Sequence, residues 1–379
     1  MHTLPRSYLI PIQKYDSIHH RNVFLGCVNI SSIIDVAKKA GVSISTVSAY
    51  INNTRYVSDE LTVRIKEAIE DLNYETNSVA RSLKSGKTKT IGIIIPNMTR
   101  VFFPQLIKGI VNTVKNHGYN LILCDSSENA DQEQHYINML KNSWVDGIIL
   151  DSILDLSPDN PYVNKLLNDK ENNKQPSIVF IEHKPKQTSC NSIIVNNEYG
   201  GYLATKYMLD LGHKKVFHIS AQQNNPMIAD RLLGYKTALS EKGIPFDGQI
   251  VKYGDLSPLS GYYCMKLLLN ERADMSAVFA ANDQMAVGAI KAIKEAGLHI
   301  PEDIGIIGFD NIFITSMIDP SLTTISVPKY MMGVEAAEML IRHIEDTGLE
   351  SEVIELPINL IERRSTNLRS EVNWDLFDW

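Results

Sequence analysis

Six polar residues end apolar, strand-like runs of this sequence, and side chains of these types can bind a polar small molecule. Carboxylates accept hydrogen bonds, and amides both donate and accept them, as a ligand rich in hydroxyl groups requires. In parallel sheets the carboxyl ends of the strands meet at one edge, where ligands bind. We therefore expect a polar, acidic cleft at Asp125, Asp151, Glu182, Asn196, Asn282 and Asp310.

Small hydroxyl-bearing residues form a second pattern, closer to the N-terminus. Ser43 is followed by Ser45, Thr46 and Ser48, just after a break at Gly41. A helix that enters the major groove of DNA, which is about 12 Å wide, favours small hydrogen-bonding residues on its outer face. The pattern fits a helix-turn-helix, although an ordinary helical hairpin would have the same turn.

The usual signatures of catalysis are absent from the sequence: G-x-G-x-x-G, G-x-S-x-G, H-E-x-x-H and a complete phosphate loop. The run Ser85-Gly86-Lys87-Thr88 resembles the end of a phosphate loop, but the first glycine of that motif would fall at Arg81. We therefore expect no enzymatic activity, no cofactor and no metal.

Composition narrows the class of protein. The 379 residues suffice for two or three folding units at about 100 to 200 residues per domain, and a net charge of -7 argues against a protein that coats nucleic acid everywhere. Hydrophobic residues make up 44% of the chain, yet no apolar run reaches the roughly 18 residues of a membrane span. The four cysteines are widely spaced, which favours a reducing compartment. We expect a cytoplasmic protein without a membrane segment.

Helical spacing dominates residues 31–76, which we interpret as a headpiece of three short helices. Ser32 and Asp35 form a capping-box pattern at the start of the first helix, and Ser43 is a good N-cap for the second. Residues 1–30 lack periodicity and are expected to form a tail. The third helical block has one apolar stripe, made of Leu61, Ile65, Ala68, Ile69 and Leu72.

Residues 77–89 form a basic linker, and strand-like runs then alternate with amphipathic helices through residues 90–366. Such alternation builds α/β domains with parallel sheets that helices cover on both faces. Nine strands exceed one doubly wound sheet, so we expect two similar lobes with a cleft between them, followed by a tail at residues 367–379. The expected strands are Ile91–Ile95, Asn120–Asp125, Val145–Asp151, Ser177–Glu182, Ser192–Asn196, Lys215–Ser220, Ile250–Gly254, Ala277–Asn282 and Ile304–Asp310.

The residues around the turn strengthen the helix-turn-helix interpretation. Asp35 to Asn52, Tyr56-Val57-Ser58, Ala68 to Tyr74 and Asn77 to Leu83 resemble the LacI (lactose repressor) family of transcription regulators, and the resemblance extends from about Ser31 to Thr366. It implies a helix-turn-helix headpiece, a hinge helix and a two-lobed sensor domain similar to periplasmic binding proteins. It also implies a homodimer whose binding to double-stranded operator DNA is controlled by a small-molecule effector.

The resemblance assigns the residues of the headpiece that contact DNA. Many family members carry arginine at the position of Ala49, so a guanine contact worth about 1 to 3 kcal/mol of discrimination is missing here. Base contacts are expected from Ile44, Ser45 and Ala49, and contacts to phosphates or flanking edges from Thr46, Ser48, Asn52 and Tyr56.

The resemblance also implies a hinge helix that folds on operator DNA. Leu83 would wedge into a minor-groove step and bend the duplex, so that more surface is contacted. The alternative for Leu83 is a linker residue that packs on the sensor domain. The expected hinge contacts are Asn77, Ala80, Arg81, Leu83 and Lys84, of which Arg81 and Lys84 would lie near phosphates.

Effector-binding residues follow from three matched stretches, Asp230 to Tyr235, Ala281 to Ala286 and Ile307 to Asp310. A carboxylate, an amide and a guanidinium suit the vicinal hydroxyls of a sugar, so we expect a carbohydrate, with a purine or a protein corepressor as the alternative. Without the matched stretches, Arg231 would be interpreted as an ion-pair residue and Asp310 as a strand-end cap. The expected set is Arg231, Asn282 and Asp310, with Glu182 from the first lobe and Phe102 or Phe103 as an apolar wall.

Two other classes of protein share parts of this pattern. A solute-binding receptor has the same two-lobed fold, but it needs an export signal and has no use for a headpiece. A nucleotide-linked enzyme would need phosphate-binding glycines after a strand. The sequence therefore predicts a DNA-binding regulator, in the first instance a repressor, and leaves open whether the effector releases or tightens DNA binding.

Overall fold

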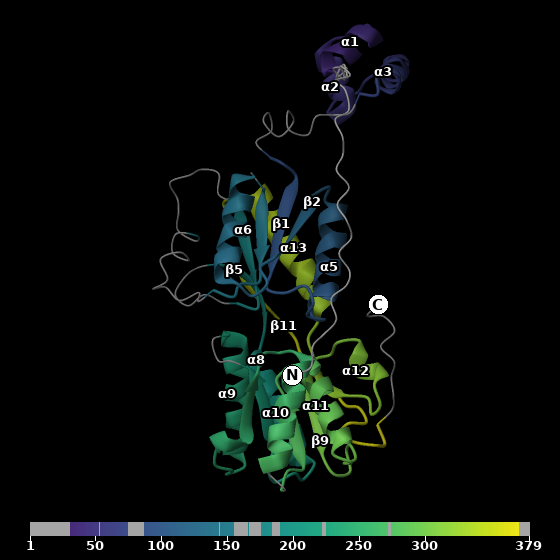
Figure 1. Ribbon diagram of the computed structural model, residues 1–379. Coiled ribbons are helices and arrows are strands. Elements are labelled where there is room, and N and C mark those ends of the chain that lie inside the picture. The colour runs from purple at the N-terminus through teal and green to yellow at the C-terminus, as the bar shows by residue number, and fades with distance from the viewer. Residues whose placement is uncertain are drawn as a thin grey trace, which may run out of the picture. The chain divides into compact units, whose positions relative to one another are not determined.

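The computed structural model describes residues 31–52, 54–74, 87–143, 145–154, 166, 176–183, 190–221, 225–271 and 274–370 (Figure 1). These residues fall in two compact units, a headpiece of residues 31–74 and a larger unit of residues 87–370. Within the described ranges, no helix has both the length and the apolar character needed to span a membrane.

The headpiece has three helices, as predicted: α1 (Ile33–Ala40), α2 (Ile44–Asn52) and α3 (Asp59–Asp71). The expected capping box is present, because the Ser32 hydroxyl accepts a bond from the Asp35 amide and the Asp35 carboxylate accepts one from the Ser32 amide. Gly41 ends α1 in the left-handed conformation, which glycine adopts without strain. The core of the trio is small and consists of Val36, Ala37, Ala40, Val47, Ile65 and Ala68.

The larger unit contains two six-stranded sheets, each the centre of one lobe (Figure 1). Lobe 1 has the strand order β11-β5-β4-β3-β1-β2 and is parallel throughout. Helices α5 (Phe103–Asn116) and α13 (Lys329–Glu345) pack against each other in this lobe, and α6 (Ala130–Asn142) contacts β1. Its strands are β1 (Thr90–Ile95), β2 (Asn120–Asp125), β3 (Gly147–Leu150), β4 (Ser177–Ile181), β5 (Asn191–Val195) and β11 (Val353–Leu356).

Lobe 2 has the strand order β12-β10-β9-β8-β6-β7, and only β12 runs antiparallel, against β10. Its strands are β6 (Phe217–Ala221), β7 (Val251–Gly254), β8 (Ala277–Ala280), β9 (Gly305–Asp310), β10 (Thr323–Ser326) and β12 (Asn359–Ile361). Its helical elements are α8 (Asn197–Asp210), α9 (Pro226–Glu241), the 3-10 turn η1 (Gly248–Ile250), α10 (Pro258–Glu271), α11 (Asp283–Glu295) and α12 (Ile314–Met317).

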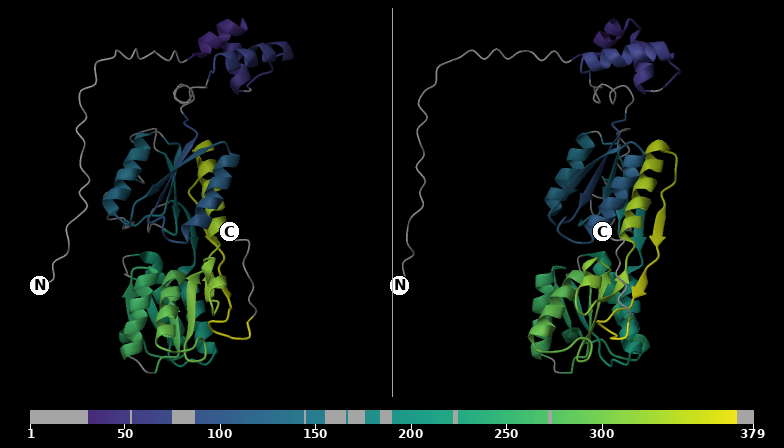
Figure 2. Two further views of the ribbon diagram at one scale, coloured as in Figure 1. Left: turned by 45° about the vertical axis from the view of Figure 1, so that its right-hand side comes forward. Right: turned by 90° about the vertical axis from the view of Figure 1, so that its right-hand side faces the viewer.

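The chain passes between the lobes three times, as the further views make visible (Figure 2). The crossings lie between β5 and α8, between β10 and α13, and between β11 and β12. The prediction of a two-lobed α/β unit is therefore confirmed. The nine predicted strands are present, whereas β10, β11 and β12 were not predicted.

Three pairs of helices approach so closely that only glycine fits at the contact. A Cβ atom on Gly201 of α8 would lie 2.1 Å from the Arg231 carbonyl oxygen of α9, and one on Gly234 of α9 would lie 1.9 Å from the Glu198 carbonyl oxygen of α8. This contact fixes α9, and with it Arg231, against α8. The same reciprocal arrangement joins α5 to α13 at Gly109 and Gly333, and α10 to α11 at Gly261 and Gly288.

Candidate functional site

The headpiece exposes much of the surface that was assigned to DNA. Ile44 and Asn52 at the two ends of α2 are exposed, and so is Ser45. Tyr56, after the helix, is 84% exposed. The headpiece thus leaves these side chains free to contact another molecule, as the predicted DNA contacts require.

Hydrogen bonds hold the polar residues of this surface in place. The Ser43 hydroxyl accepts a bond from the Thr46 amide at 3.1 Å, which confirms the predicted N-cap, and it lies 2.7 Å from the Ser45 hydroxyl. The Asn52 side-chain amide donates to the Ser48 carbonyl oxygen at 2.8 Å. Thr46 and Ser48 are half-buried, so they present only part of their surface to a ligand.

Ala49 differs from the expectation that it lies on the outer face of α2. Its side chain is only 4% exposed. Its methyl group extends only one bond from the backbone, whereas a longer side chain at this position would reach further from the helix. The hinge residues Asn77, Ala80, Arg81, Leu83 and Lys84 lie outside the described residues.

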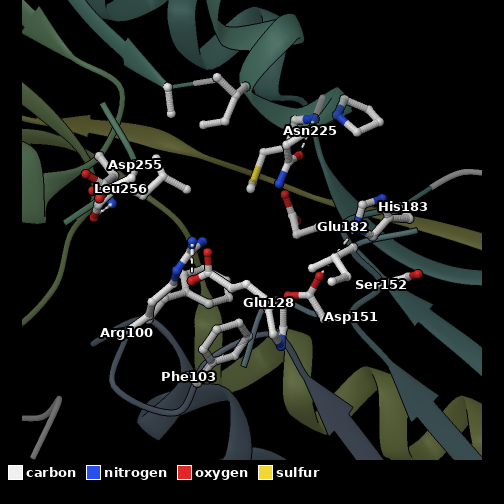
Figure 3. A pocket seen from close by; sticks show the side chains of 18 of the residues that line it. Arg100, Phe103, Glu128, Asp151, Ser152, Glu182, His183, Asn225, Asp255 and Leu256 are labelled. Carbon is white, nitrogen blue, oxygen red and sulfur yellow. Dashed lines mark hydrogen bonds and ion pairs between the residues drawn. The ribbon is translucent and has the colours of Figure 1, made fainter. Parts of the chain in front are cut away.

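The larger unit contains a cavity of about 540 Å³ between its lobes (Figure 3). Lobe 1 contributes the ends of β3 and β4 and the start of α5, and lobe 2 contributes α9, the start of α11 and the end of β9. All six residues that were predicted to bind the effector border this cavity: Phe102, Phe103, Glu182, Arg231, Asn282 and Asp310.

Two of the six predicted strand-end residues do not line the cavity. The Asp125 carboxylate accepts bonds from the Met98 and Ser127 amides and so fixes the turn after β2. Asn196 is the N-cap of α8 and accepts a bond from the Tyr199 amide at 2.9 Å. Both are local capping residues, a role that short polar side chains at strand and helix ends often have.

Arg231 is almost fully buried in the wall of the cavity, with 2% of its surface exposed. Its Nε donates to the Asn197 side-chain oxygen at 2.8 Å, Nη1 to the Ala281 carbonyl oxygen at 2.6 Å, and Nη2 to Asp310 Oδ1 at 3.3 Å. The guanidinium also stacks on the Phe309 ring, 3.6 Å from its centre. Packing and hydrogen bonds thus hold the side chain before any ligand arrives, which is the preorganisation that binding sites need.

Glu182 offers the cavity a buried oxygen without a partner. Its Oε2 accepts a bond from Asn197 Nδ2 at 2.8 Å, while Oε1 has no hydrogen-bond partner among the described residues. Burial raises the pKa of Glu182 to about 7, although the Asn197 hydrogen bond and the Arg231 charge act in the opposite direction. A buried polar atom without a partner costs free energy, so Oε1 is a site at which a ligand donor would be favourable.

Asn197 was missed by sequence reasoning, although it directly follows Asn196. Its amide oxygen faces Arg231 of lobe 2 and its amide nitrogen faces Glu182 of lobe 1. It therefore joins the two walls of the cavity. The signal in the sequence was the paired asparagines at a strand end, of which the first is a cap and the second is the bridge.

Asn282 and Asp310 are also held by the protein. The Asn282 side chain caps α11 by accepting from the Met285 amide, and it donates to the Leu256 carbonyl oxygen at 3.0 Å. Asp310 has a φ of 107°, a strained value for a residue other than glycine. The Lys329 ammonium group donates to the carbonyl oxygens of Asp310 and Asn311, which stabilises this conformation.

Further ionisable residues line the cavity and were not assigned as ligands from the sequence. His183 Nε2 lies 3.4 Å from Asp151 Oδ1, and Arg100 Nη2 lies 2.7 Å from Glu128 Oε1. Burial lowers the pKa of His183, but the hydrogen bond and charge of Asp151 outweigh it, so that the pKa is raised overall. Asp255 is the fifth carboxylate of the lining, after Glu128, Asp151, Glu182 and Asp310.

In a comparison with known proteins, each of the two units matches a family model. Residues 32–77 match the family model "Bacterial regulatory proteins, lacI family", and residues 205–366 match "Periplasmic binding protein-like domain". The "HTH-type transcriptional repressor PurR" of Aliivibrio salmonicida is 36% identical over 338 residues, which cover 89% of this chain and 99% of the relative. The protein of the same name from Edwardsiella ictaluri is 37% identical over 338 residues, covering 89% and 97%.

The chain belongs to the LacI family. It is a DNA-binding transcriptional repressor of that family, and it is a regulator and not an enzyme.

Solved structures of LacI-family proteins have the same architecture. The Lac repressor dimer bound to operator and the anti-inducer ONPF is 27% identical with a TM-score of 0.79, covering 89% of this chain and 99% of its own. A LacI family transcriptional regulator from Enterococcus faecium with bound ribose is 31% identical with a TM-score of 0.65, covering 73% and 98%. The fold, the headpiece and the repressor function predicted from the sequence are thus confirmed.

Proposed function

We propose that this repressor senses a free carbohydrate. The carbohydrate binds in the cavity between the lobes and changes the affinity of the repressor for operator DNA. The observation that carries the proposal is the surplus of hydrogen-bond acceptors in the cavity, above all the buried Glu182 Oε1 without a partner. Sugar hydroxyls donate to such acceptors, and the Phe102 and Phe103 rings offer an apolar surface for the face of a sugar ring. The ribose-bound regulator from Enterococcus faecium supports this choice.

A purine is the second candidate for the effector. The relatives named PurR favour it, and a flat aromatic ligand could use the same two phenylalanine rings. A purine has fewer hydrogen-bond donors than a sugar, so it would satisfy fewer of the carboxylate oxygens. A protein corepressor is the third candidate, and it would bind outside the cavity.

We also propose that the protein acts as a homodimer in the cytoplasm, with the larger unit of residues 90–366 as the dimerisation and sensor domain. The headpiece of residues 31–76 would read the operator through α2 and Tyr56, and the hinge of residues 77–89 would insert Leu83 into the minor groove. Two headpieces joined in a symmetric dimer match a near-palindromic operator. The Lac repressor dimer bound to operator supports this arrangement.

A salt-dependent gel shift tests the DNA side of this proposal, with the upstream region of the protein's own gene as the probe. Specific binding that weakens steeply with salt is expected, because phosphate contacts release counterions. Leu83→Ala should weaken specific binding by about tenfold and nonspecific binding much less. Equal losses for both kinds of duplex would exclude the wedge, and a folded dimer that binds no duplex at low salt would contradict the assignments of the hinge and α2.

A thermal-shift screen against free sugars and purine bases tests the effector side. A ligand at 100 times its Kd stabilises the protein by about 2.7 kcal/mol, which is readily measured. Stabilisation by a sugar, together with a change in the gel shift, is the expected result. Stabilisation by a purine base alone would replace the carbohydrate with the second candidate.

A further inference from the structure

The described lining of the cavity between the lobes contains more carboxyl groups than groups that can be cationic. Five carboxylates border it, whereas its described lining contains only three groups that can be cationic: Arg100, His183 and Arg231. Each of these three already faces a carboxylate within the cavity. Arg231 pairs with Asp310, Arg100 with Glu128 and His183 with Asp151.

The two remaining carboxylates, Glu182 and Asp255, determine which ligands the cavity favours. Glu182 is bound through one oxygen by the neutral amide of Asn197, and its second oxygen has no hydrogen-bond partner in the part of the chain that the structure describes. Asp255 is bound by the Ser257 amide at 2.9 Å. Neither faces a cation in the described lining at ion-pair distance, so both retain acceptor capacity for a ligand that donates hydrogen bonds.

An anionic ligand would meet unfavourable electrostatics in this cavity. Like charges repel more strongly in a partly buried site than in water, because the effective dielectric constant is lower. To bind an added phosphate group, Arg231 or His183 would have to leave a largely buried carboxylate, and a buried carboxylate that loses its partner is strongly destabilising. Arg100 would have to leave Glu128, which is half-exposed and also accepts a bond from the Asn97 side-chain amide. The Arg231 pair is the least available, because packing on Phe309 and two further hydrogen bonds hold it.

From this charge distribution we infer that the effector is an uncharged molecule and that the cavity rejects its phosphate ester. A free sugar is thus bound and the sugar phosphate is excluded; for a purine, the free base is bound and the nucleotide is excluded. The inference rests on the proposed effector site and adds the charge of the ligand to it. It gives the repressor a means to distinguish a nutrient before phosphorylation from the same compound after it.

Matched pairs of compounds test the inference by isothermal titration calorimetry with the full-length protein. The pairs are D-ribose and D-ribose 5-phosphate, D-glucose and D-glucose 6-phosphate, and hypoxanthine and inosine 5′-monophosphate. We expect the uncharged member of one pair to bind at least tenfold more tightly than its ester. An ester that binds as tightly as its parent, or more tightly, would overturn the inference.

The same pairs also distinguish a failure of the carbohydrate assignment from a failure of the exclusion of phosphate esters. If neither sugar binds and hypoxanthine binds at least tenfold more tightly than inosine 5′-monophosphate, the carbohydrate assignment fails while the exclusion of phosphate stands. If no uncharged compound of the three pairs binds, the carbohydrate assignment and the inference that rests on it both fail.

One substitution tests whether cavity charge is the cause. Asp255→Asn removes the charge of a carboxylate that faces no cation in the described lining, so the ratio of sugar affinity to ester affinity should fall at least threefold. Asp274→Asn is the matched control, because Asp274 pairs with Lys215 on the surface and lies outside the cavity. An unchanged ratio in Asp255→Asn, or the same change in Asp274→Asn, would overturn the charge explanation.

Discussion

Glu182 and His218 are buried ionisable residues that make the stability of the larger unit depend on pH in opposite directions. Burial raises the pKa of Glu182 to about 7 and lowers the pKa of His218 to about 4. Each group is therefore favoured in its uncharged form by folding. Glu182 lies at the cavity, whereas His218 lies in the core between the rings of Tyr235 and Phe279, at 4.9 and 4.7 Å.

Glu182→Gln is expected to stabilise the protein in alkaline solution. The protonated carboxyl stabilises the fold fully below about pH 4.5, and this contribution is lost as the pH rises towards 7. The glutamine variant cannot lose it, so its free energy of unfolding should exceed that of the parent by up to about 3 kcal/mol near pH 8 and equal it near pH 4. Urea unfolding at both pH values measures this, with the exposed Glu302→Gln as the control.

The same variant should bind the effector at least tenfold more weakly, because an amide replaces one of the two acceptor oxygens with a donor. A variant that gains stability and keeps its effector affinity would remove Glu182 from the site. One that loses stability at both pH values would show that the carboxylate is needed for packing.

His218→Phe should remove part of the acid sensitivity of the protein. The neutral imidazole stabilises the fold above about pH 6.5, and this contribution is lost as the pH falls towards 4, by up to about 3 kcal/mol. Phenylalanine preserves the ring stack but cannot bond the Phe279 carbonyl oxygen, which His218 Nδ1 contacts at 2.8 Å, so a constant loss of about 1 to 2 kcal/mol is expected.

The test of this prediction compares unfolding curves at about pH 7 and pH 5. The difference between the two should be smaller in His218→Phe than in the parent, while the exposed His299→Gln should behave like the parent. An identical difference in all three proteins would assign the acid sensitivity to other groups.

At the scale of helices, the contact between α8 and α9 links packing to the effector site. Gly234→Ala would place a methyl group against the Glu198 carbonyl oxygen, so the helices must move apart. Such overpacking costs about 1 to 3 kcal/mol, and it separates Arg231 on α9 from Asn197 on α8. We therefore expect a lower Tm and an effector affinity at least fivefold weaker.

Gly248→Ala is the matched control, because its added methyl group would meet nothing closer than a Phe246 ring carbon at 3.8 Å. Its Tm and affinity should stay near those of the parent. If Gly234→Ala lowered the Tm without any effect on binding, the spacing of α8 and α9 would not govern the site.

The elements that the sequence predicted are those with a strong local pattern. The nine predicted strands are runs of apolar, often β-branched residues, and α1 and α2 of the headpiece begin at the capping residues Ser32 and Ser43. β10, β11 and β12 are three or four residues long, and each is stabilised by partners from other parts of the chain, such as β5 for β11. No local pattern specifies such pairings.

Local sequence patterns also predicted part of the cavity. Strand ends and matched stretches brought six residues to it, since topology places them there. The bridge by Asn197, the pairing of His183 with Asp151 and the burial of Ala49 depend on side-chain packing between distant segments. Residue type and spacing alone do not determine these contacts.

At the scale of the whole molecule, each lobe has exposed apolar residues that fit the proposed dimer. In lobe 1 these lie on edge strand β2 and on α5, and in lobe 2 they recur at every fourth residue of α10, so they share one face of the helix. An exposed edge strand with apolar side chains otherwise favours aggregation. The residues are Val111, Ile122 and Leu123 in lobe 1, and Leu259, Tyr263 and Leu267 in lobe 2.

Leu123→Glu combined with Leu267→Glu should convert the protein to a monomer, because two buried charges per subunit would oppose association. Operator affinity should fall at least a hundredfold, as one headpiece alone makes half of the contacts. Analytical ultracentrifugation and a gel shift measure both. The equally exposed Leu349→Glu is the control, and a dimer that survives the double substitution would move the interface elsewhere.

The three crossings all lie at one end of lobe 1, so a rotation of the lobes relative to each other would pivot at this end. The cavity lies next to these crossings, whereas the opposite end of β1, where the Thr88 and Lys89 amides bind Asp146, is about 20 Å away at 3.3 Å per residue. A rotation of about 10° would move that end by roughly 3 Å while the cavity walls move far less. In the proposed dimer, a slight closure around a ligand would therefore shift the start of the larger unit in each subunit, which residues 77–86 join to its headpiece.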